Sequence, residues 1–522
     1  MGHVFLKKNR ITGLALIITM LGSVAGCGAS SGETDAVIQG LVQGQGTAAG
    51  DVGYEVPQQS PVTLVDQIGY GTDMEKKVIF RGEDLPGSFS VYSLDGGSPA
   101  YTGQIMKTTY DEELGEYVSY GYFSDLMREG EYYISSDVIG ESYSFSIKDG
   151  IFDTLFNTAC KKYYRNRCGI ALSESYAGES AHSACHTTMA RLRDDPSVQI
   201  DVTGGWHMDE QAGRDTAVGA RLAQDLVLAY EMNPAAFEDD TGIPESGNLI
   251  PDILDEVRYE AEWLLKMQDS RTGGVYAAAV TDLSRGGDLF AAPVLVTPVS
   301  MDSTISFAAM MARFSYFYQQ FDQQFATTCL KAADRAWTCF LNNQSADGDS
   351  AALNAAAQLY RATGASSYHE VLRSYFKRED FGELFDGDEN AFLGAVTYLS
   401  INQKVDVETC TRLMKLLMQK SEDIASKASS SAYFVCSDAP DGDFRKLLSD
   451  MRALTITDHI IYNYEYTTII ENHVHYLLGM NPRAVNYLTD DTQGSYVNVG
   501  GTGLMNDPEE DALLIFMLSV LV

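Results

Sequence analysis

A stretch of thirteen residues, 201–213, concentrates side chains able to do acid–base chemistry on a bound ligand. The two adjacent carboxylates, Asp209 and Glu210, can give or take a proton. Trp206 offers a flat apolar face, and the glycines before it allow a backbone to approach a ligand closely. This composition predicts a ligand site, with a tight turn around a buried tryptophan as the structural alternative.

A second acidic group lies near the C-terminus, at residues 507–511 around Pro508. Carboxylates in the first turn of a helix are stabilised by the helix dipole, and proline suits the first helical position. The group therefore predicts the start of a helix. The same carboxylates are also candidates for proton transfer.

The cysteines argue against a disulfide framework. Apart from Cys27 near the N-terminus, the other seven of the eight cysteines are widely spaced along the chain. An odd number at such spacing is not typical of disulfide scaffolds. We expect some of these thiols to be buried or bound to a metal ion.

The charge balance limits the kinds of partner. The chain has 72 Asp+Glu against 37 Lys+Arg, which gives a formal net charge of -35. So acidic a protein is a poor ligand for nucleic acid or anionic lipid, and a neutral or cationic partner is expected.

At 522 residues with 45% hydrophobic content, the chain is expected to fold into two or more domains.

Residues 1–26 have the layout of an export signal, with basic residues ahead of an apolar run at 11–21. That run is too short for a stable membrane span. Residues 24–27, Val-Ala-Gly-Cys, resemble a bacterial lipobox, which implies cleavage before Cys27 and lipid attachment to its thiol. A plain signal peptide or an N-terminal anchor is the alternative. We expect an extracellular protein that is lipid-anchored to the bacterial cell membrane and meets the membrane through that anchor only.

Two segments of different composition follow the export signal. Residues 27–60 are rich in Gly, Ser, Gln and Ala, which predicts a flexible linker. Residues 61–150 contain short runs of β-branched and aromatic residues, separated by turn signals such as Asp95-Gly96-Gly97. Strands at this spacing predict a small β-sandwich.

Helical periodicity runs through residues 151–522. Apolar residues return every three or four positions, which marks one buried face on each helix. About a dozen helices without a heptad repeat indicate antiparallel pairs, arranged as a bundle, a solenoid or a closed ring. The expected helices include residues 214–232, 249–268, 303–321, 323–341, 351–363, 406–420, 460–478 and 508–521.

A set of short motifs runs in a fixed order along about 450 residues. The motifs are Asp66-Gln67-Ile68-Gly69-Tyr70, Tyr163 to Gly169, Ala184-Cys185-His186, Gly204-Gly205-Trp206-His207, residues 243–256, Trp263 to Gln268, Gly273 to Tyr276 and Tyr476 to Pro482. In this order they resemble glycoside hydrolase family 9, preceded by the immunoglobulin-like domain of some bacterial cellulases. The resemblance implies an immunoglobulin-like β-sandwich followed by an all-α (α/α)6 barrel. It also implies inverting hydrolysis of β-1,4-glucans such as cellulose.

The turn after His207 departs from the family pattern. The family takes its base from Asp-Ala-Gly-Asp at this point, whereas this chain has Met208-Asp209-Glu210-Gln211. Inverting hydrolysis needs a carboxylic acid and a carboxylate roughly 6.5 to 9.5 Å apart. The resemblance therefore implies a base at Asp209 or Glu210, with the turn displaced by one residue.

The acid is implied just before the last helix. The family uses the Glu of an Asn-Glu pair there, so Asp507 is the nearest equivalent and Glu509 the second choice. The family's Pro-His-His-Arg loop is missing from residues 490–506, which contain neither His nor Arg. Two hypotheses follow: a hydrolase with rearranged carboxylates, or a catalytically inactive relative that binds glycans or acts as a scaffold at the cell surface.

Four residues resemble the zinc site of the family: Cys168, Cys185, His186 and His207. Two thiolates and two imidazoles form a suitable tetrahedral set. From spacing alone, buried thiols with a core histidine remain the alternative. The resemblance implies structural zinc, and calcium, which is common in the family, is a further candidate, although no loop of oxygen ligands stands out.

Aromatic residues complete the predicted site. Trp206, Tyr163 and Tyr164 are candidates for lining a sugar cleft, with burial in the core as the alternative. The expected partner is a β-glucan polysaccharide or oligosaccharide. We expect a monomer that binds no nucleic acid.

Overall fold

The structure is a computed structural model that describes residues 54–112, 114–136, 138–284, 286–344, 349–437, 443–488, 496 and 507–522. The predicted export signal, the predicted lipid-attachment residue Cys27 and most of the predicted linker fall in residues 1–53, outside the described residues. Across the described ranges, no helix combines the length and the apolar character needed to cross a bilayer.

The N-terminal domain consists of two β-sheets. One sheet has the strand order β1-β3-β7-β6, and the other has the order β2-β10-β8-β4-β5 with β9 beside β8. Neighbouring strands are antiparallel except β10 and β2. The strands are β1 Thr63–Leu64, β2 Gly69–Tyr70, β3 Lys77–Arg81, β4 Ser88–Ser93, β5 Tyr101–Gln104, β6 Met106–Asp111, β7 Glu116–Tyr122, β8 Gly130–Ser136, β9 Gly140–Glu141 and β10 Phe145–Ile147.

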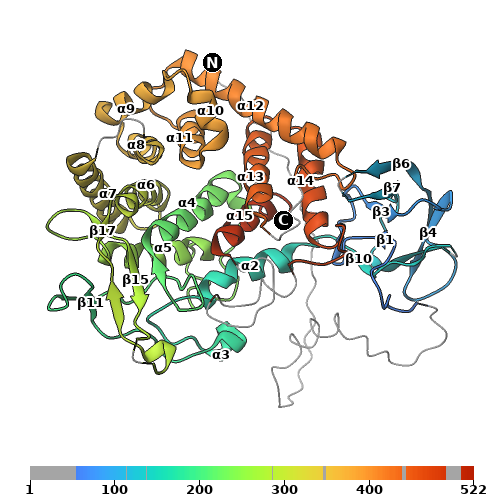
Figure 1. The fold of residues 1–522 in the computed structure, drawn as a ribbon, viewed down its shortest axis with the longest axis horizontal. Coiled ribbons are helices and arrows are strands. Elements are labelled where there is room, and N and C mark those ends of the chain that lie inside the picture. Colours follow the sequence, from blue (N-terminus) through green and yellow to red (C-terminus); the bar gives the residue numbers. More distant parts are fainter. Residues whose placement is uncertain are drawn as a thin grey trace, which may run out of the picture. The chain divides into compact units, whose positions relative to one another are not determined.

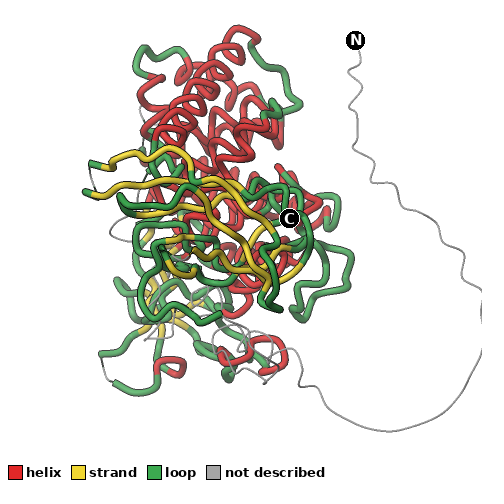
Figure 2. The backbone as a smooth tube through the Cα atoms, turned by 90° about the vertical axis from the view of Figure 1, so that its right-hand side faces the viewer, coloured by secondary structure: helices red, strands yellow, loops and turns green. Residues whose placement is uncertain are grey.

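Side-chain alternation explains why the two sheets face each other. Phe89 and Val91 on β4 are buried while the residues between and around them are not. The Phe89 ring packs 5.3 Å from that of Phe80 on the opposite sheet. Gly121 on β7 is required there, because a Cβ at this position would lie 2.4 Å from the Phe89 ring. This face-to-face packing is the predicted β-sandwich, and Figure 2 shows its strands gathered together in yellow.

The second domain is mainly helical, and every helix expected from periodicity is present. The helices are α2 Asp153–Arg165, α3 Glu174–Ala177, α4 Thr216–Met232, α5 Asp252–Lys266, α6 Met301–Tyr318, α7 Gln323–Asn343, α8 Ser350–Thr363, α9 Ser366–Phe376, α10 Phe381–Gly387, α11 Glu389–Ser400, α12 Val407–Ser430, α13 Arg445–Ile460, α14 Tyr464–Leu477 and α15 Pro508–Leu518. Three 3-10 turns add η1 Gly178–Ser180, η2 Pro234–Ala236 and η3 Leu289–Ala291.

These helices form an inner and an outer layer (Figure 1). Helix α4 packs against α6 and α15, α6 packs against α8, α8 against α11, and α13 against α15. These inner helices are buried on nearly all sides, as α8 is from residue 352 to residue 361. Helix α7 instead buries only one stripe, at three- and four-residue spacing, and covers α6 from outside. The remaining outer helices, among them α2, α5, α9, α12 and α14, pack on the inner layer in the same way.

Small sheets, which the helical periodicity did not predict, lie ahead of the inner helices. One has the strand order β12-β11-β16-β15-β13 and the other pairs β14 with β17. Strand β13 leads into α4 and β17 leads into α6, so these sheets fix the loops at the N-terminal ends of inner helices. The strands are β11 Ala190–Leu192, β12 Gln199–Ile200, β13 Arg214–Asp215, β14 Val275–Tyr276, β15 Ala278–Thr281, β16 Val294–Val296 and β17 Val299–Ser300.

Candidate functional site

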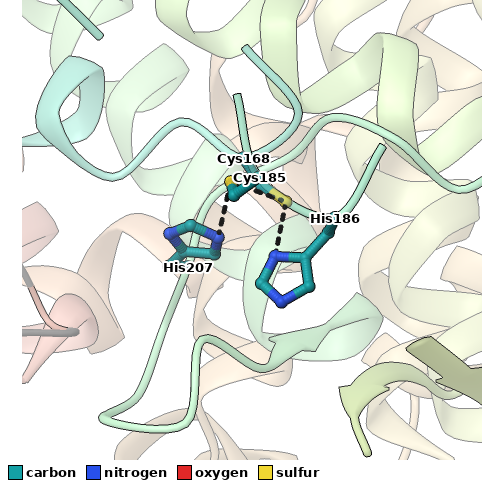
Figure 3. Close-up of side chains that lie close together, drawn as sticks. All are labelled: Cys168, Cys185, His186 and His207. Carbon is teal, nitrogen blue, oxygen red and sulfur yellow. Dashed lines mark hydrogen bonds between the residues drawn. The ribbon is translucent and has the colours of Figure 1, made fainter. Parts of the chain in front are cut away.

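Four buried side chains between α2 and α4 point toward one another (Figure 3): Cys168, Cys185, His186 and His207. Backbone pairing brings two of them together, because Cys168 N–H donates to Gly205 O and His207 N–H donates to Asn166 O, each at 2.8 Å. Gly205 has a φ of +78°, and a Cβ there would lie 2.6 Å from the Trp263 ring. Only glycine satisfies both conditions, which explains the glycine directly before Trp206.

The distances in this cluster have the shape of a metal site. Cys185 Sγ lies 3.8 Å from Cys168 Sγ and 3.7 Å from His207 Nε2, and Cys168 Sγ lies 3.5 Å from His186 Nδ1. A tetrahedral zinc ion with bonds of about 2.3 Å to sulfur and about 2.0 Å to nitrogen sets two sulfurs about 3.8 Å apart and sulfur and nitrogen about 3.5 Å apart. The four ligand atoms all lie within 4.8 Å of one another. The cluster therefore matches a tetrahedral site of two sulfurs and two nitrogens.

The electrostatics of the cluster suit a cation. Burial raises the pKa of Cys168. The hydrogen bond between Cys185 and Cys168 lowers the pKa of Cys185 and favours its thiolate form. Burial lowers the pKa of His207, which keeps its imidazole neutral. Metal binding requires deprotonated thiols and neutral imidazoles. Thr281 Oγ1 lies 3.3 Å from His186 Nε2 and directs the other ring nitrogen, Nδ1, at the cluster.

The predicted base residues lie on the turn between this cluster and α4. Asp209 Oδ1 accepts hydrogen bonds from the backbone N–H groups of Gln211 at 2.9 Å and Gly213 at 2.8 Å. Met208 N–H closes the turn by donating to Gly213 O at 2.9 Å. Asp209 therefore shapes the turn through its side chain. Asp209 and Glu210 are both exposed.

The predicted acid residues lie at the N-terminal end of α15. Asp507 is the N-cap, since its Oδ1 accepts from the backbone N–H of Glu509 at 2.8 Å and of Glu510 at 3.4 Å. Its Oδ2 lies 2.5 Å from Arg445 Nη2. The carboxylate of Glu509 lies 3.6 Å from Arg445 Nη1 and 3.7 Å from Arg221 Nη1. The predicted helix start is confirmed, and both oxygens of Asp507 are engaged in it or in an ion pair.

Ion pairs that the sequence did not predict connect four inner helices, α4, α11, α13 and α15, near the N-terminal end of α15. Arg221 on α4 lies 3.4 Å from Glu389, the first residue of α11, as well as near Glu509. Arg452 on α13 lies 2.5 Å from Asp225 on α4 and 2.7 Å from Glu389. A signal was present in the sequence, because charged residues interrupt otherwise apolar helical segments at these positions. The N-terminal ends of α11 and α15 thus meet the N-terminal half of α4.

The pKa values of two carboxylates in this network are shifted in opposite directions. Burial raises the pKa of Asp225 to about 6, although Arg452 opposes the shift. Burial also raises the pKa of Glu389, but the charges and hydrogen bonds of Arg452 and Arg221 more than offset it and hold that pKa below 4.5. The side chain of Glu389 is 33% exposed, while that of Asp225 is 4% exposed. A partly exposed, ionised carboxylate beside further acidic groups can do acid–base chemistry on a bound ligand.

The aromatic residues expected to line a cleft are in the core. Trp206 and Tyr163 are fully buried and pack with ring centroids 4.7 Å apart, and Tyr164 is 1% exposed. Trp206 Nε1–H donates to Glu256 at 3.4 Å, and its backbone N–H donates to Glu260 at 2.9 Å. Burial therefore leaves no ring face of these three residues open to a sugar, and the alternative of core packing describes them.

Most of the segment before α15, residues 489–495 and 497–506, lies outside the described residues, together with the position of the absent Pro-His-His-Arg loop. Tyr496 is described and is buried beside α15. Its hydroxyl donates to Asp511 Oδ2 at 2.5 Å, and its backbone N–H donates to Asn166 Oδ1 at 2.9 Å. Lys162 pairs with the same Asp511 oxygen at 2.7 Å. These contacts tie residue 496 to α2 and α15.

Two family models match the chain. The model described as "Glycosyl hydrolase family 9" matches residues 152–499, and the model described as "Cellulase N-terminal ig-like domain" matches residues 58–141. The first match covers most of the helical domain, and the second covers most of the β-sandwich.

Curated relatives agree with these matches. A cellodextrinase of Butyrivibrio fibrisolvens is 28% identical over 478 residues, which cover 83% of this chain and 86% of the relative. An endoglucanase D of Acetivibrio thermocellus is 30% identical over 338 residues, which cover 58% of this chain and 53% of the relative.

Solved structures share the fold. A metagenome-derived glycoside hydrolase family 9 endoglucanase superposes with a TM-score of 0.75 at 23% identity, over 88% of this chain and 98% of that chain. A zinc-binding triple mutant of a family 9 endoglucanase superposes with a TM-score of 0.72 at 21% identity, over 86% of this chain and 99% of that chain.

Proposed function

The chain belongs to glycosyl hydrolase family 9, and on that premise we propose that it hydrolyses β-1,4-glucan, as cellulose or cello-oligosaccharide, with inversion. The observation that carries the proposal is a shared contact: Glu389 at the start of α11 and Glu509 at the start of α15 both lie beside Arg221 on α4. The packing of α4 against both α6 and α15 supports closure of the inner helices into the (α/α)6 barrel of the family. The glucan would then bind across the N-terminal ends of the inner helices.

Glu509 is the proposed proton donor. Asp507, the nearest match to the family's acid, caps α15 with one oxygen and pairs with Arg445 through the other. Glu509 has a longer side chain and meets Arg221 and Arg445 only at 3.6 to 3.7 Å. It is therefore the freer carboxylate of the two, and Asp507 holds the first turn that presents it.

The base expected from the sequence lies on the turn before α4. Asp209 stabilises that turn through its own side chain, so Glu210 is the more available of the two exposed carboxylates. Packed helices have axes roughly 8 to 10 Å apart. The contact of Arg221 on α4 with Glu509 on α15 brings these two helix ends together, and an inverting pair needs a separation of roughly 6.5 to 9.5 Å.

Release of reducing ends from cellohexaose tests the proposal. We expect turnover by the wild type and a loss of roughly 100-fold or more in kcat for Glu509→Gln, because proton donation to the leaving oxygen is removed. Glu408→Gln is a matched control, since Glu408 is an exposed first-turn glutamate on the outer helix α12. A wild type without turnover would contradict the proposal, as would equal losses in both variants.

A second candidate function is glycan binding without turnover. The observation that favours it is that Arg221 and Arg445 contact Glu509 and Arg445 contacts Asp507, so cations occupy the carboxylate oxygens that an acid must present. Calorimetric titration of cellohexaose separates the candidates. Binding by a wild type that releases no reducing ends would select the second.

We further propose that the metal cluster holds a structural zinc ion. Thiolate and imidazole ligands favour zinc over calcium, which takes oxygen ligands. The tetrahedral distances and the burial of all four side chains support a closed site without an open position for substrate. Such a site would fix the loops that carry Cys185 and His207 ahead of α4.

The cellular location stays a proposal from the sequence. We propose that the mature chain is lipid-anchored through Cys27 and extracellular, because residues 1–26 have the layout of a lipoprotein signal, and that it acts there as a monomer. Mass spectrometry of the N-terminal peptide tests this by the mass of an attached lipid. An unmodified Cys27 in membrane-extracted protein would contradict it.

A further inference from the structure

Glu389 shares a cation with the proposed proton donor. Arg221 Nη1 lies 3.4 Å from Glu389 Oε2 and 3.7 Å from Glu509 Oε2. Because both oxygens contact the same nitrogen, they are at most about 7 Å apart. This upper limit reaches the lower end of the roughly 6.5 to 9.5 Å separation of an inverting pair. The shared contact with Arg221 therefore sets an upper limit on the separation of Glu389 and Glu509, whereas the spacing from Glu509 to the turn before α4 rests only on helix packing.

We infer that Glu389 is the general base of the proposed hydrolysis, opposite Glu509, in place of the two carboxylates expected from the sequence, Asp209 and Glu210. The inference rests on the proposed function and names a catalytic residue for it.

The surroundings of Glu389 suit a base. Arg452 Nη2 lies 2.7 Å from its Oε1, and Arg221 binds its Oε2. Asp225, which also faces Arg452, is the acidic neighbour from α4, and Asp388 caps α11 beside it. The two arginines hold the pKa of Glu389 below 4.5 despite its burial, so the carboxylate is ionised at neutral pH. Each carboxylate oxygen keeps a second lone pair for a water proton.

A buried pair holds this base in place. Arg452 and Asp225 are 1% and 4% exposed and lie 2.5 Å apart, so the cation that binds Glu389 is itself anchored to α4. Glu389 also begins its helix, where the positive end of the helix dipole favours a negative charge. The side chain is 33% exposed, and water can therefore reach it.

The step balances with water as the co-reactant. The water oxygen forms a bond to the anomeric carbon while Glu389 takes one water proton, and the bond from that carbon to the leaving oxygen breaks with its electron pair on the oxygen. The carboxyl of Glu509 protonates the leaving oxygen. The products are two shorter glucans, and the proton on Glu389 returns to Glu509 through solvent.

Steady-state kinetics on cellohexaose with purified full-length variants test the inference. We expect Glu389→Gln to lower kcat roughly 100- to 10,000-fold with little change in affinity, while the exposed control Glu408→Gln keeps the wild-type kcat. Calorimetric titration and thermal unfolding confirm that Glu389→Gln still folds and binds sugar. Added azide should restore turnover in this variant by taking the place of water and give an α-glycosyl azide, which a structural defect would not do.

The wild-type pH profile is a second measurement, independent of any variant. A base must be ionised, so the acid limb of kcat/KM should lie below the ordinary range of a glutamate, because Arg452 and Arg221 lower the pKa of Glu389. The inference is overturned if Glu389→Gln stays active while Glu210→Gln does not, or if azide gives no rescue. A wild type that binds cellohexaose without any turnover overturns the proposed function and this inference with it.

Discussion

Asp507 and Glu509 are two residues apart and have different tasks. One oxygen of Asp507 satisfies two backbone N–H groups of the first turn of α15, and the other meets Arg445. A carboxylate with these contacts builds the helix end. Glu509 lies in the same first turn, and its carboxylate is 3.6 to 3.7 Å from the guanidinium groups of Arg445 and Arg221. A similar division occurs before α4, where the Asp209 side chain accepts the hydrogen bonds that form the turn and Glu210 lies exposed beside it.

The metal cluster makes a prediction at the residue scale. We expect one zinc ion per chain in the purified protein, and we expect Cys185→Ser to lose the metal and unfold at a lower temperature, because a ligand thiolate is removed. Elemental analysis and thermal unfolding measure both effects. Acid should release the ion as the ligands take up protons.

Cys410→Ser is the control for this prediction. Cys410 is a partly buried thiol on α12 and is not one of the four clustered residues. It should keep the zinc ion and the unfolding temperature of the wild type. A metal-free wild type as stable as the metal-loaded protein would show that the cluster is only a set of buried thiols and imidazoles.

At the scale of elements, the ends of the inner helices make the site. Helices α11 and α15 each begin with a capping aspartate followed by a glutamate that points to the cations of α4 and α13. Buried Arg452 joins α13 to α4 and α11 at once. One buried guanidinium group therefore pairs with carboxylates from two neighbouring helices.

Substituting Arg452 tests this pairing. Arg452→Met leaves Asp225 buried without its cation, and the expected loss is about 3 to 5 kcal/mol in the free energy of unfolding. Arg445→Met is the control, because its guanidinium is 52% exposed and such pairs contribute about 0 to 1 kcal/mol. Urea unfolding measures both. Equal losses in the two variants would contradict this account.

The pH dependence of the Arg452→Met loss has a defined sign. The pKa of Asp225 is already raised to about 6 by burial in the wild type, and removing a cation raises it further. Protonation neutralises the carboxylate and stabilises the folded variant as the pH falls. The loss should therefore be smaller at pH 5 than at pH 8.

Part of this structure follows from the sequence, and part cannot. Periodicity predicted α4 to α8, α12, α14 and α15, since an amphipathic or wholly apolar helix leaves a local pattern. The cap at Asp507 was also predicted, because capping is local. The network of Arg221, Glu389 and Arg452 joins residues far apart in the chain, so no local pattern reveals which charges meet. Burial of Trp206 likewise depends on long-range partners such as Glu256 and Glu260.

At the scale of the molecule, the β-sandwich and the helical domain share a polar interface within one compact unit, residues 53–522. Buried Asp66 lies 2.7 Å from His475 Nδ1, and Gln67 N–H donates to Leu478 O at 2.9 Å. Lys77 Nζ donates to Asn472 Oδ1 at 3.1 Å. Buried polar groups that depend on each other across a boundary couple the stability of the two domains.

Calorimetry tests this coupling. We expect one unfolding transition for both domains in the wild type, and a clearly lower transition temperature for Asp66→Ala, because His475 would be left buried without its partner. Asp73→Ala, at an exposed position near the same interface, should leave the transition unchanged. Two separate transitions in the wild type would show that the domains unfold independently.

The account depends on hydrolysis of a β-1,4-glucan with inversion by carboxylates at the N-terminal ends of the inner helices. Proton NMR of the wild type mixed with cellohexaose tests it most directly, because the spectrum follows both cleavage and the configuration of each new reducing end. The account predicts that the α-anomer appears first and then converts to the equilibrium mixture. An initial β-anomer, or unchanged cellohexaose in the presence of bound protein, would contradict it.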